Sequence, residues 1–372
     1  MPTTAQTNDA AFDFLVSRAD LHQTRLAPAP AASSIRLQPG QVLLAVDTFA
    51  FTANNITYAV FGEAMGYWDF FPAPRGEGRV PVWGFAEVAA SAHPVIEPGE
   101  RIFGYFPMST YLLVDASDVN AAGFSDAAAH RAHLHPLYNY YTRCSADPGY
   151  DAGREAEQMI FRPLFMTAFL IDDFLADNRF FGAKQVLLTS ASSKTAISLA
   201  FQLHANRGAE CEIVGLTSPA NIAFVEGLGC YHRVVTYGDI ASLSASIPAA
   251  LVDMAGNGGV VRAVHSHFGD RLKYSCMVGG THWDRISQEQ QLCGPAPVLF
   301  FAPAQMAKRA QDWGAAGLQR RIGDAWAKFL GPVSGSMRVV RGRGPAAVQH
   351  VYCEVLDGRA DPSHGQVLSL HE

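Results

Sequence analysis

The chain has 372 residues, 49% of them hydrophobic, and a net charge of −6. This length and composition indicate a globular protein with one large domain or, as we expect, two. The sequence contains no block of like charge and no apolar run of membrane-spanning length, so we expect neither nucleic acid nor a membrane as a partner.

The N-terminus and the cysteines bear on the cellular compartment. Residues 1–20 include Asp9 and Asp13 where a signal peptide would be basic and then apolar, which predicts a cytoplasmic protein. The cysteines show no CxxC pair or other short spacing, so they indicate neither a disulfide framework nor a structural zinc site. They are Cys144, Cys211, Cys230, Cys276, Cys293 and Cys353.

Residues 1–39 are interpreted as an N-terminal extension, partly helical near Phe12 to Leu15 and then rich in Ala and Pro. From Gln41 the sequence changes to short β segments separated by Gly and Pro turns, a spacing typical of a small twisted barrel. The segments are QVLLAVDTFAF, VPVWGFAEVAAS, ERIFGYFP and TYLLVDAS. We assign residues 40–160 to this barrel domain, completed by residues 332–372.

Alternating strands and helices occupy residues 161–331. Lys184 to Thr189 has the pattern of a buried strand, helical spacing begins at Thr195, and Cys211 to Leu216 has the pattern of a second buried strand. This order predicts a βαβ unit in a doubly wound parallel sheet, and hence an α/β protein. The first strand-to-helix turn of such a unit presents N–H groups and the positive end of a helix dipole, which suit a dinucleotide pyrophosphate.

The turn after this first strand lacks the glycine fingerprint of dinucleotide-binding proteins. At the spacing of G-x-G-x-x-G it has Ala191, Ser193 and Ala196. Hydroxyl groups and one ammonium group could hold phosphate instead. The candidate cofactor-binding residues of the turn are Ala191, Ser192, Ser193, Lys194 and Thr195. A Ser-rich turn that only caps the helix is the alternative, because Ser and Thr are favoured at that position.

Several segments follow one another in an order that resembles the medium-chain dehydrogenase/reductase superfamily. They are VLLAVDTFAFTANN, VPVWGFAEVAASAHPVIEPGERIFGYFP, RPLFMTAF, KQVLLTSASSKTAISLA and IVGLTSPANIAFVEGLGCYHRVVTY. Within that superfamily the chain resembles an uncharacterised branch, catalogued as a domain of unknown function, over roughly residues 35–330. The resemblance implies a GroES-like barrel followed by a Rossmann domain, with NAD(P)H bound between them.

The sequence departs from the zinc-dependent members of the superfamily. Where those members carry a Cys and a His that bind zinc, this chain has Thr52 and Trp83, and it also lacks their lobe of four cysteines. Neither side chain replaces a thiolate or imidazole ligand, so we expect no zinc. A carbonyl or alkene substrate would then be polarised by hydrogen-bond donors.

The end of the second strand bears on the choice of cofactor. NAD-preferring Rossmann domains have an Asp or Glu there, whereas this chain has Thr217, Ser218 and Pro219. Without a carboxylate to repel a 2′-phosphate, and with Thr217, Ser218 and Asn221 as donors, NADPH is favoured over NADH. The same residues could simply begin the next helix, with Ser218 as its N-cap.

Catalytic candidates fall in three segments, and for each a packing role is the alternative. On the barrel, Asn55 and Tyr58 could act on the substrate, since a tyrosine can supply a proton as hydride arrives. After the segment KYSCMVGG, His282 could donate a proton. A third, His/Tyr-rich segment contains His135, Tyr138, Tyr140 and Tyr141. The resemblance adds four residues beside the nicotinamide: Thr167, Gly279, Gly280 and Thr281.

Two functions remain open from the sequence. The first is a zinc-independent, NADPH-dependent oxidoreductase that acts on an activated C=C or C=O bond of a small molecule, for which the many barrel aromatics suggest an aromatic one. The second is a protein that kept the fold without hydride transfer, as a binding module or a lyase-like or hydratase-like enzyme. The apolar run from Val298 to Met306 resembles the late strand that family members pair across a dimer, so a homodimer is expected.

Overall fold

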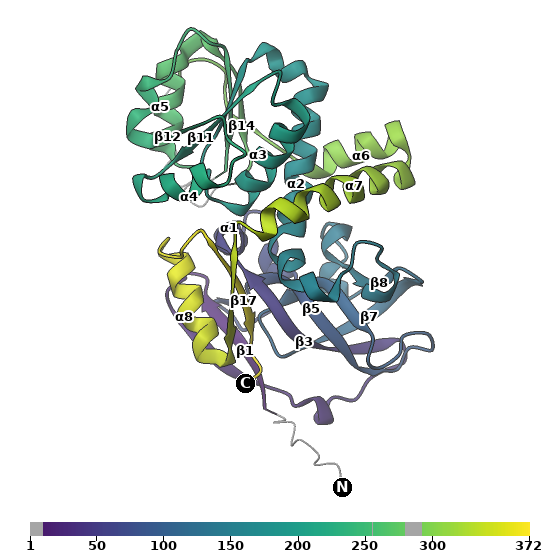
Figure 1. The fold of residues 1–372 in the computed structure, drawn as a ribbon. Helices are drawn as coiled ribbons and strands as arrows, with labels where there is room; N and C mark the ends of the chain where they lie inside the picture. The colour runs from purple at the N-terminus through teal and green to yellow at the C-terminus, as the bar shows by residue number, and fades with distance from the viewer. Residues whose placement is uncertain (1–9, 255, 280–291) are drawn as a thin grey trace. The chain divides into compact units, whose positions relative to one another are not determined.

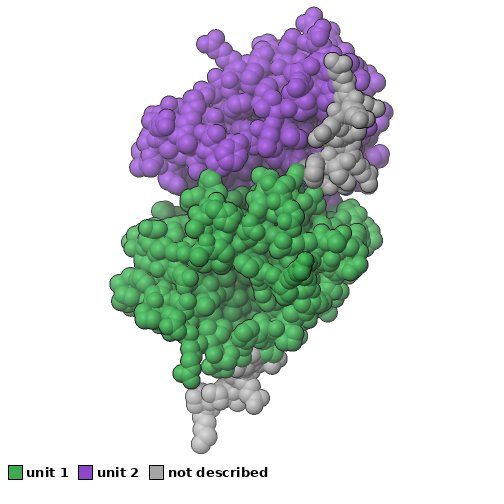
Figure 2. Space-filling model, turned by 180° about the vertical axis from the view of Figure 1, so that it is seen from behind, with its two compact units in different colours: residues 1–160, 339–360, 365–372 green, residues 161–338, 361–364 purple. Residues whose placement is uncertain are grey.

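The computed structural model describes residues 10–254, 256–279 and 292–372 (Figure 1). The chain divides into two compact units, coloured separately in Figure 2. Unit 1 contains the residues up to Ile160 together with residues 339–360 and 365–372, and unit 2 contains residues 161–338 and 361–364. The predicted α/β class is confirmed, because one unit holds a closed barrel and the other a parallel sheet with helices.

Unit 1 is built on a β-barrel of six strands among the described residues. The barrel closes because β3 pairs with β5 along one edge and with β7 along the other. Two register shifts in the pairing of β3 with β5 mark irregularities of the kind that bend a long strand. In order around the barrel the strands are β3 (Gln41–Phe51), β5 (Pro81–Ser91), β6 (Arg101–Pro107), β9 (Tyr140–Arg143), β8 (Gly123–Asp126) and β7 (Tyr111–Asn120).

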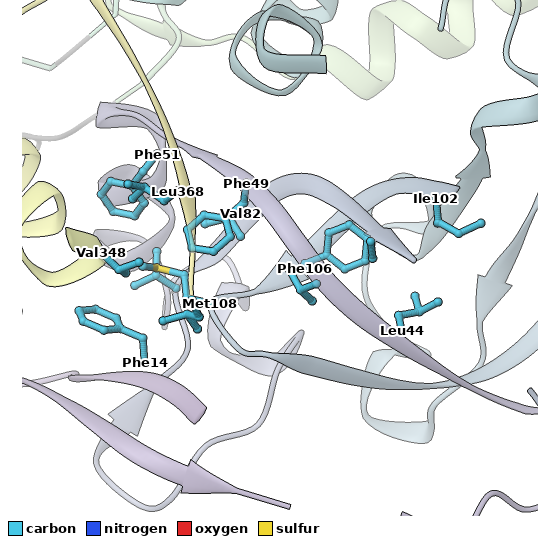
Figure 3. Packing of buried hydrophobic residues seen from close by; sticks show 14 of the residues in the cluster. Phe14, Leu44, Phe49, Phe51, Val82, Ile102, Phe106, Met108, Val348 and Leu368 are labelled. Atoms are coloured by element: carbon cyan, nitrogen blue, oxygen red, sulfur yellow. The ribbon is translucent and has the colours of Figure 1, made fainter. Parts of the chain in front are cut away.

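The core of unit 1 joins parts of the chain that are far apart in sequence. Figure 3 shows Phe14, Val348 and Leu368 in the same packed cluster as the barrel residues Phe49 and Phe106. The C-terminal elements thus complete the core of the barrel unit. Besides the N-terminal sheet, α1 (Ala53–Val60), β16 (Arg338–Arg343), α8 (Gly344–Leu356) and β17 (His364–Ser369) lie outside the barrel, and β17 pairs with β3.

The N-terminal segment forms a sheet, so the helix expected near Phe12 to Leu15 is wrong. β1 (Ala11–Ser17) pairs with β2 (Thr24–Ala29) and with β4 (Glu77–Gly78). Phe14 and Val16 point into the core of unit 1, two residues apart as strand geometry requires. Pairing with distant residues therefore overrode the local helical pattern.

Unit 2 contains a parallel sheet in the strand order β12-β11-β10-β13-β14-β15. The two predicted strands of the βαβ unit are confirmed as β10 and β11. The strands are β10 (Gln185–Leu188), β11 (Glu212–Thr217), β12 (Arg233–Thr236), β13 (Ala249–Asp253), β14 (Leu272–Met277) and β15 (Val298–Leu299). The helices are α2 (Glu155–Asp177), which begins in unit 1, α3 (Lys194–Arg207), α4 (Ile222–Gly227), α5 (Gly258–Phe268), α6 (Ala302–Trp313) and α7 (Ala315–Ser334).

The late apolar run is shorter as a strand than the sequence suggested. Only Val298–Leu299 pairs with the sheet, and α6 begins at Ala302 with Pro303 in its first turn. Proline is well suited to that position because its missing N–H has no helical partner there. No helix within the described ranges is long and apolar enough to cross a membrane.

Candidate functional site

The strand order of the unit 2 sheet reverses at β10. The strands β11 and β12 lie on one side of it and β13, β14 and β15 on the other, so β10 marks the switch point. Ligands of such sheets bind outside the carboxyl ends of the strands at this point. Thr189 follows β10, and its hydroxyl donates to Oδ1 of Asp253 at 2.6 Å and accepts from the N–H of Met254 at 2.9 Å. These bonds hold the ends of β10 and β13 together beneath the turn.

The turn after β10 is held by its own backbone and by the hydroxyl of Tyr237. Ser190 adopts a left-handed conformation with φ of 49°, and its N–H donates to the hydroxyl of Tyr237 at 3.1 Å. The Ser193 side chain accepts from the N–H of Ala196 at 3.3 Å and so caps α3. The helix-cap role weighed from the sequence is therefore real, and it sets the start of α3 at the switch point.

Ala191 occupies the place of the first fingerprint glycine. It is fully buried, and its carbonyl oxygen accepts from the hydroxyl of Tyr231 at 2.8 Å. A Cβ on Gly215 of β11 would lie 3.0 Å from the Ala191 Cβ and 2.9 Å from the Tyr231 ring. The glycine that makes room for the turn is thus on the neighbouring strand, which explains how the turn can do without one.

The start of α3 offers free donors for an anion. Within the part of the chain that the structure describes, the N–H groups of Ser192, Lys194 and Thr195 have no hydrogen-bond acceptor. The first N–H groups of a helix point along its axis and carry its positive partial charge. The side-chain amide of Asn221 donates to the Ser192 hydroxyl at 3.1 Å, which links this turn to the segment after β11.

Lys194 does not extend freely from the turn. The residue is only 9% exposed, and Nζ donates to the carbonyl oxygen of Pro362 at 2.5 Å. Burial lowers the pKa of this ammonium group to about 8, against a smaller opposing effect of Asp361. The one side-chain cation of the turn is therefore bound by the protein itself.

The remaining predicted cofactor residues lie in several elements of unit 2. Thr217 ends β11 and is buried, while Ser218 after it is half-buried. Thr167 lies half-buried on α2. Gly279 follows β14, and a Cβ there would lie 2.4 Å from the carbonyl oxygen of Met254, so only glycine fits. Three predicted residues lie outside the described residues: Gly280, Thr281 and His282.

In unit 1 the predicted residues Asn55 and Tyr58 both lie on α1. Oδ1 of Asn55 accepts from the N–H of Thr52 at 2.8 Å, and its amide donates to the Pro81 carbonyl at 2.9 Å. Asn55 is thus committed to the capping box of α1. Thr52 is the N-cap of the same helix.

Tyr58 belongs to a group of packed rings that we call the aromatic cluster. Its hydroxyl accepts from Nε1 of Trp83 at 3.4 Å, and burial raises its pKa. Its ring lies 4.7 Å from that of Tyr67 and 5.5 Å from that of Tyr105. The aromatic cluster consists of Tyr58, Tyr67, Phe70, Phe71, Trp83, Tyr105 and Tyr138.

The His/Tyr-rich segment contributes to this cluster through Arg131, which the sequence analysis missed. Arg131 is fully buried, pairs with Asp126 at 2.8 Å and donates to the carbonyl oxygen of Tyr138 at 2.7 Å. It thereby holds the Tyr138 ring against Tyr105, 4.9 Å between centroids. Of the other residues in the segment, Tyr141 accepts from Arg131, His135 caps a short 3-10 helix and Tyr140 lies near Asn120.

Among the residues that the structure describes, no group of three or more His, Cys, Asp and Glu side chains is placed to hold a metal ion. The arrangement in unit 2 suits a phosphate-bearing nucleotide.

Several solved structures share the fold of this chain. The chain is similar to CurA from Vibrio vulnificus in complex with NADPH, at 13% identity and a TM-score of 0.61, over 97% of this chain and 99% of that one. It is similar to the yhdH oxidoreductase from Salmonella enterica in complex with NADP, at 13% identity and a TM-score of 0.55, over 96% and 99%. It is similar to the Etr1p/Etr2p heterodimer of mitochondrial 2-enoyl thioester reductase from Candida tropicalis. The identity is 11% and the TM-score 0.53, over 97% of this chain and 99% of that one.

A comparison with curated protein sequences gave no match. A match to a family of unknown function, by contrast, covers most of the chain, from the end of β3 to the segment before β17. Residues 49–361 match the family described as "Protein of unknown function (DUF2855)", and the chain belongs to that family.

Proposed function

We propose that the protein is an NADPH-dependent reductase that transfers hydride to an activated C=C or C=O bond of a small molecule. The observation that carries this proposal is the start of α3 at the switch point of the sheet, where three N–H groups face no acceptor among the described residues. CurA and the yhdH oxidoreductase, which share the fold, are named as complexes with NADPH and NADP.

In this proposal residues 161–331 bind the nucleotide, and residues 40–160 with residues 332–372 bind the substrate. The pyrophosphate lies on the turn after β10. NADPH is preferred to NADH because β11 ends without a carboxylate, and Thr217, Ser218 and Asn221 donate to the 2′-phosphate. The other proposed nucleotide contacts are Thr167, Ala191, Ser192, Ser193, Lys194, Thr195, Gly279, Gly280 and Thr281.

The proton that follows the hydride comes from Tyr58 in this proposal. Its hydroxyl is hydrogen-bonded to the side chains of Trp83 and Asn54, and both bonds lower its pKa against the larger effect of burial, which favours release of its proton to a substrate oxygen or carbon. Asn55 acts by holding the start of the helix that carries Tyr58, and His282 is the second candidate donor. With Thr52 and Trp83 at the family's zinc-binding positions, we propose that hydrogen bonds polarise the substrate without zinc.

Thermal unfolding with NADPH, with NADH and without nucleotide tests the proposal. A ligand at about 100 times its dissociation constant adds about 2.7 kcal/mol to the free energy of unfolding, which raises Tm by several degrees. NADPH should raise Tm at lower concentration than NADH. Oxidation of bound NADPH by enones, quinones and aldehydes then tests the reaction. A protein that neither nucleotide stabilises is no NADPH reductase.

The second candidate is a protein that kept this fold without hydride transfer, as a binding module or as a lyase-like or hydratase-like enzyme. The observation that favours it is Lys194, whose ammonium group is bonded to Pro362 and buried. The absence of glycines from the turn points the same way. Under this candidate, neither nucleotide binds, while apolar carbonyl compounds still stabilise the protein.

We further propose a cytoplasmic homodimer with a small-molecule substrate. β15 pairs with β14 on one side, and within the described ranges no strand covers its other side. Val298, Leu299 and Phe301 are each about half exposed there, which is unusual for an edge exposed to water. A second copy of the chain would cover this edge. A monomeric mass in light scattering at micromolar concentration, or a dimer that survives Leu299→Lys unchanged, would contradict the proposed interface.

A further inference from the structure

The hydroxyl of Tyr105 is buried and has no hydrogen-bond partner within the described part of the chain. Its ring lies at the centre of the aromatic cluster, within 6.0 Å of the rings of Tyr58, Phe70, Phe71, Trp83 and Tyr138. A buried hydroxyl without a partner costs about 1–3 kcal/mol, so proteins seldom keep one where phenylalanine would serve. The unused donor therefore points to a missing acceptor.

Among the described residues no group accepts from the Tyr105 hydroxyl, and the polar groups around it are bonded to one another. Arg131 nearby can only donate. Its guanidinium donates hydrogen bonds to Asp126, Asn139, Tyr141 and the Tyr138 carbonyl. Tyr58 accepts from Trp83. The hydroxyl of Tyr138 interacts with that of Tyr67 through a hydrogen bond. At the centre of the cluster, the Tyr105 hydroxyl is thus a hydrogen-bond donor without an acceptor among the described residues.

The surroundings also limit the kind of ligand that could accept from Tyr105. The rings around it are apolar, and the neighbouring cation is neutralised by Asp126. A carboxylate would lose its hydration there without gaining a counter-ion, which is costly. A neutral carbonyl oxygen accepts hydrogen bonds without donating any, and a flat conjugated molecule can lie against the rings.

We infer that the hydroxyl of Tyr105 donates a hydrogen bond to the carbonyl oxygen of the substrate, an uncharged conjugated ketone, aldehyde, quinone or ester. Tyr67 and Tyr138, the half-buried rings next to Tyr105 and Tyr58, must move aside for such a ligand to reach it. Tyr105 is then a substrate-binding residue that also polarises the bond receiving the hydride. The role of Tyr105 in hydride transfer rests on the proposed function. Its role in binding the carbonyl compound does not, because that binding needs no nucleotide.

A pair of Tyr→Phe variants tests the inference through stability. Tyr105→Phe removes a hydroxyl with no partner, so its Tm should equal or exceed that of the unchanged protein. Tyr352→Phe removes a hydroxyl that donates to the Leu21 carbonyl at 2.9 Å, so its Tm should fall. A fall for Tyr105→Phe as large as that for Tyr352→Phe would show that the Tyr105 hydroxyl already has a partner, and would overturn the inference.

A matched pair of ligands tests the same inference through binding. Acetophenone presents a carbonyl oxygen, and α-methylstyrene has the same shape with a methylene group in its place. Without nucleotide, Tyr105→Phe should weaken acetophenone binding about five- to tenfold and leave α-methylstyrene binding unchanged. Equal affinities of the unchanged protein and Tyr105→Phe for acetophenone, or no binding of acetophenone to the unchanged protein, would overturn the inference. Nucleotide-induced stabilisation, measured in parallel, reports separately on the proposed function.

Discussion

The ammonium nitrogen of Lys194 lies 2.5 Å from the carbonyl oxygen of Pro362, and the bond joins two parts of the chain that are 168 residues apart. Lys194 is the first residue of α3, at the turn that we propose to bind the nucleotide. Pro362 belongs to the segment of residues 361–364 that interrupts the C-terminal part of unit 1 and packs in unit 2. The bond therefore fixes the position of this segment against the start of α3.

The burial of Lys194 predicts a pH-dependent stability. Its pKa is lowered from 10.5 to about 8 in the folded protein. Between about pH 8 and pH 10.5 the unfolded chain binds more protons than the folded one, so the free energy of unfolding rises with pH through this window, by up to about 1.4 kcal/mol per pH unit. Lys194→Met should lose this rise. Urea unfolding of both proteins at several pH values measures it, and parallel pH profiles would refute the prediction.

The same bond predicts how Lys194 affects nucleotide binding. Because the ammonium group is held by Pro362, Lys194→Ala should act through the position of the turn. We expect similar losses of affinity for NADPH and NADH, about tenfold or less, which is about 1.4 kcal/mol. Isothermal titration calorimetry with both nucleotides measures this. A loss confined to NADPH would instead mean that Lys194 leaves Pro362 and pairs with the 2′-phosphate.

Ser190 predicts a simple gain of stability. An L-residue in the left-handed region costs about 1–2 kcal/mol, whereas glycine adopts it freely but also gains entropy in the unfolded chain. Ser190 has a φ of 49°. We therefore expect Ser190→Gly to raise the free energy of unfolding by about 0.5 kcal/mol. Ser190→Ala keeps the Cβ and serves as the control, with no gain. If the glycine variant melts below the alanine variant, the backbone strain is not what limits stability there.

Tyr58 is the residue on which the proposed proton transfer depends. Removal of a general acid typically lowers the rate by about 10²–10⁴-fold, so Tyr58→Phe should lose turnover to that extent while its NADPH affinity stays unchanged. Tm should fall slightly, because Nε1 of Trp83 loses its acceptor. Tyr150→Phe removes a half-buried hydroxyl bond to Glu155 and should keep full turnover. Undiminished turnover of Tyr58→Phe would exclude Tyr58 as the donor.

Much of unit 2 was open to prediction because its signals are local. The strand, turn and helix from β10 to α3 follow from apolar spacing and a Ser-rich turn within about twenty residues. β3 of the barrel was predicted with its observed bounds, Gln41–Phe51, because a run rich in β-forming residues ends at a helix cap. Such patterns are set by neighbours along the chain, so the sequence alone determined them.

Other features depended on contacts between distant residues. β1 was misread as helix because its strand pairing comes from β2 and β4, and the short strands β8 and β9 were not predicted. The pattern of Asn55 indicated a catalytic candidate, but the Pro81 carbonyl and the Thr52 N–H use its side chain. Local propensity says nothing about such partners.

The candidate site shows the same division. The sequence by itself determined which donors gather in the turn after β10 and that no carboxylate follows β11. Only the tertiary structure decided that Gly215 makes room for Ala191, that Pro362 binds Lys194 and that Tyr105 is left without a partner. The physical reason is that a hydrogen bond or a close packing contact depends on where two side chains meet in space, and the spacing of residues along one segment does not contain that information.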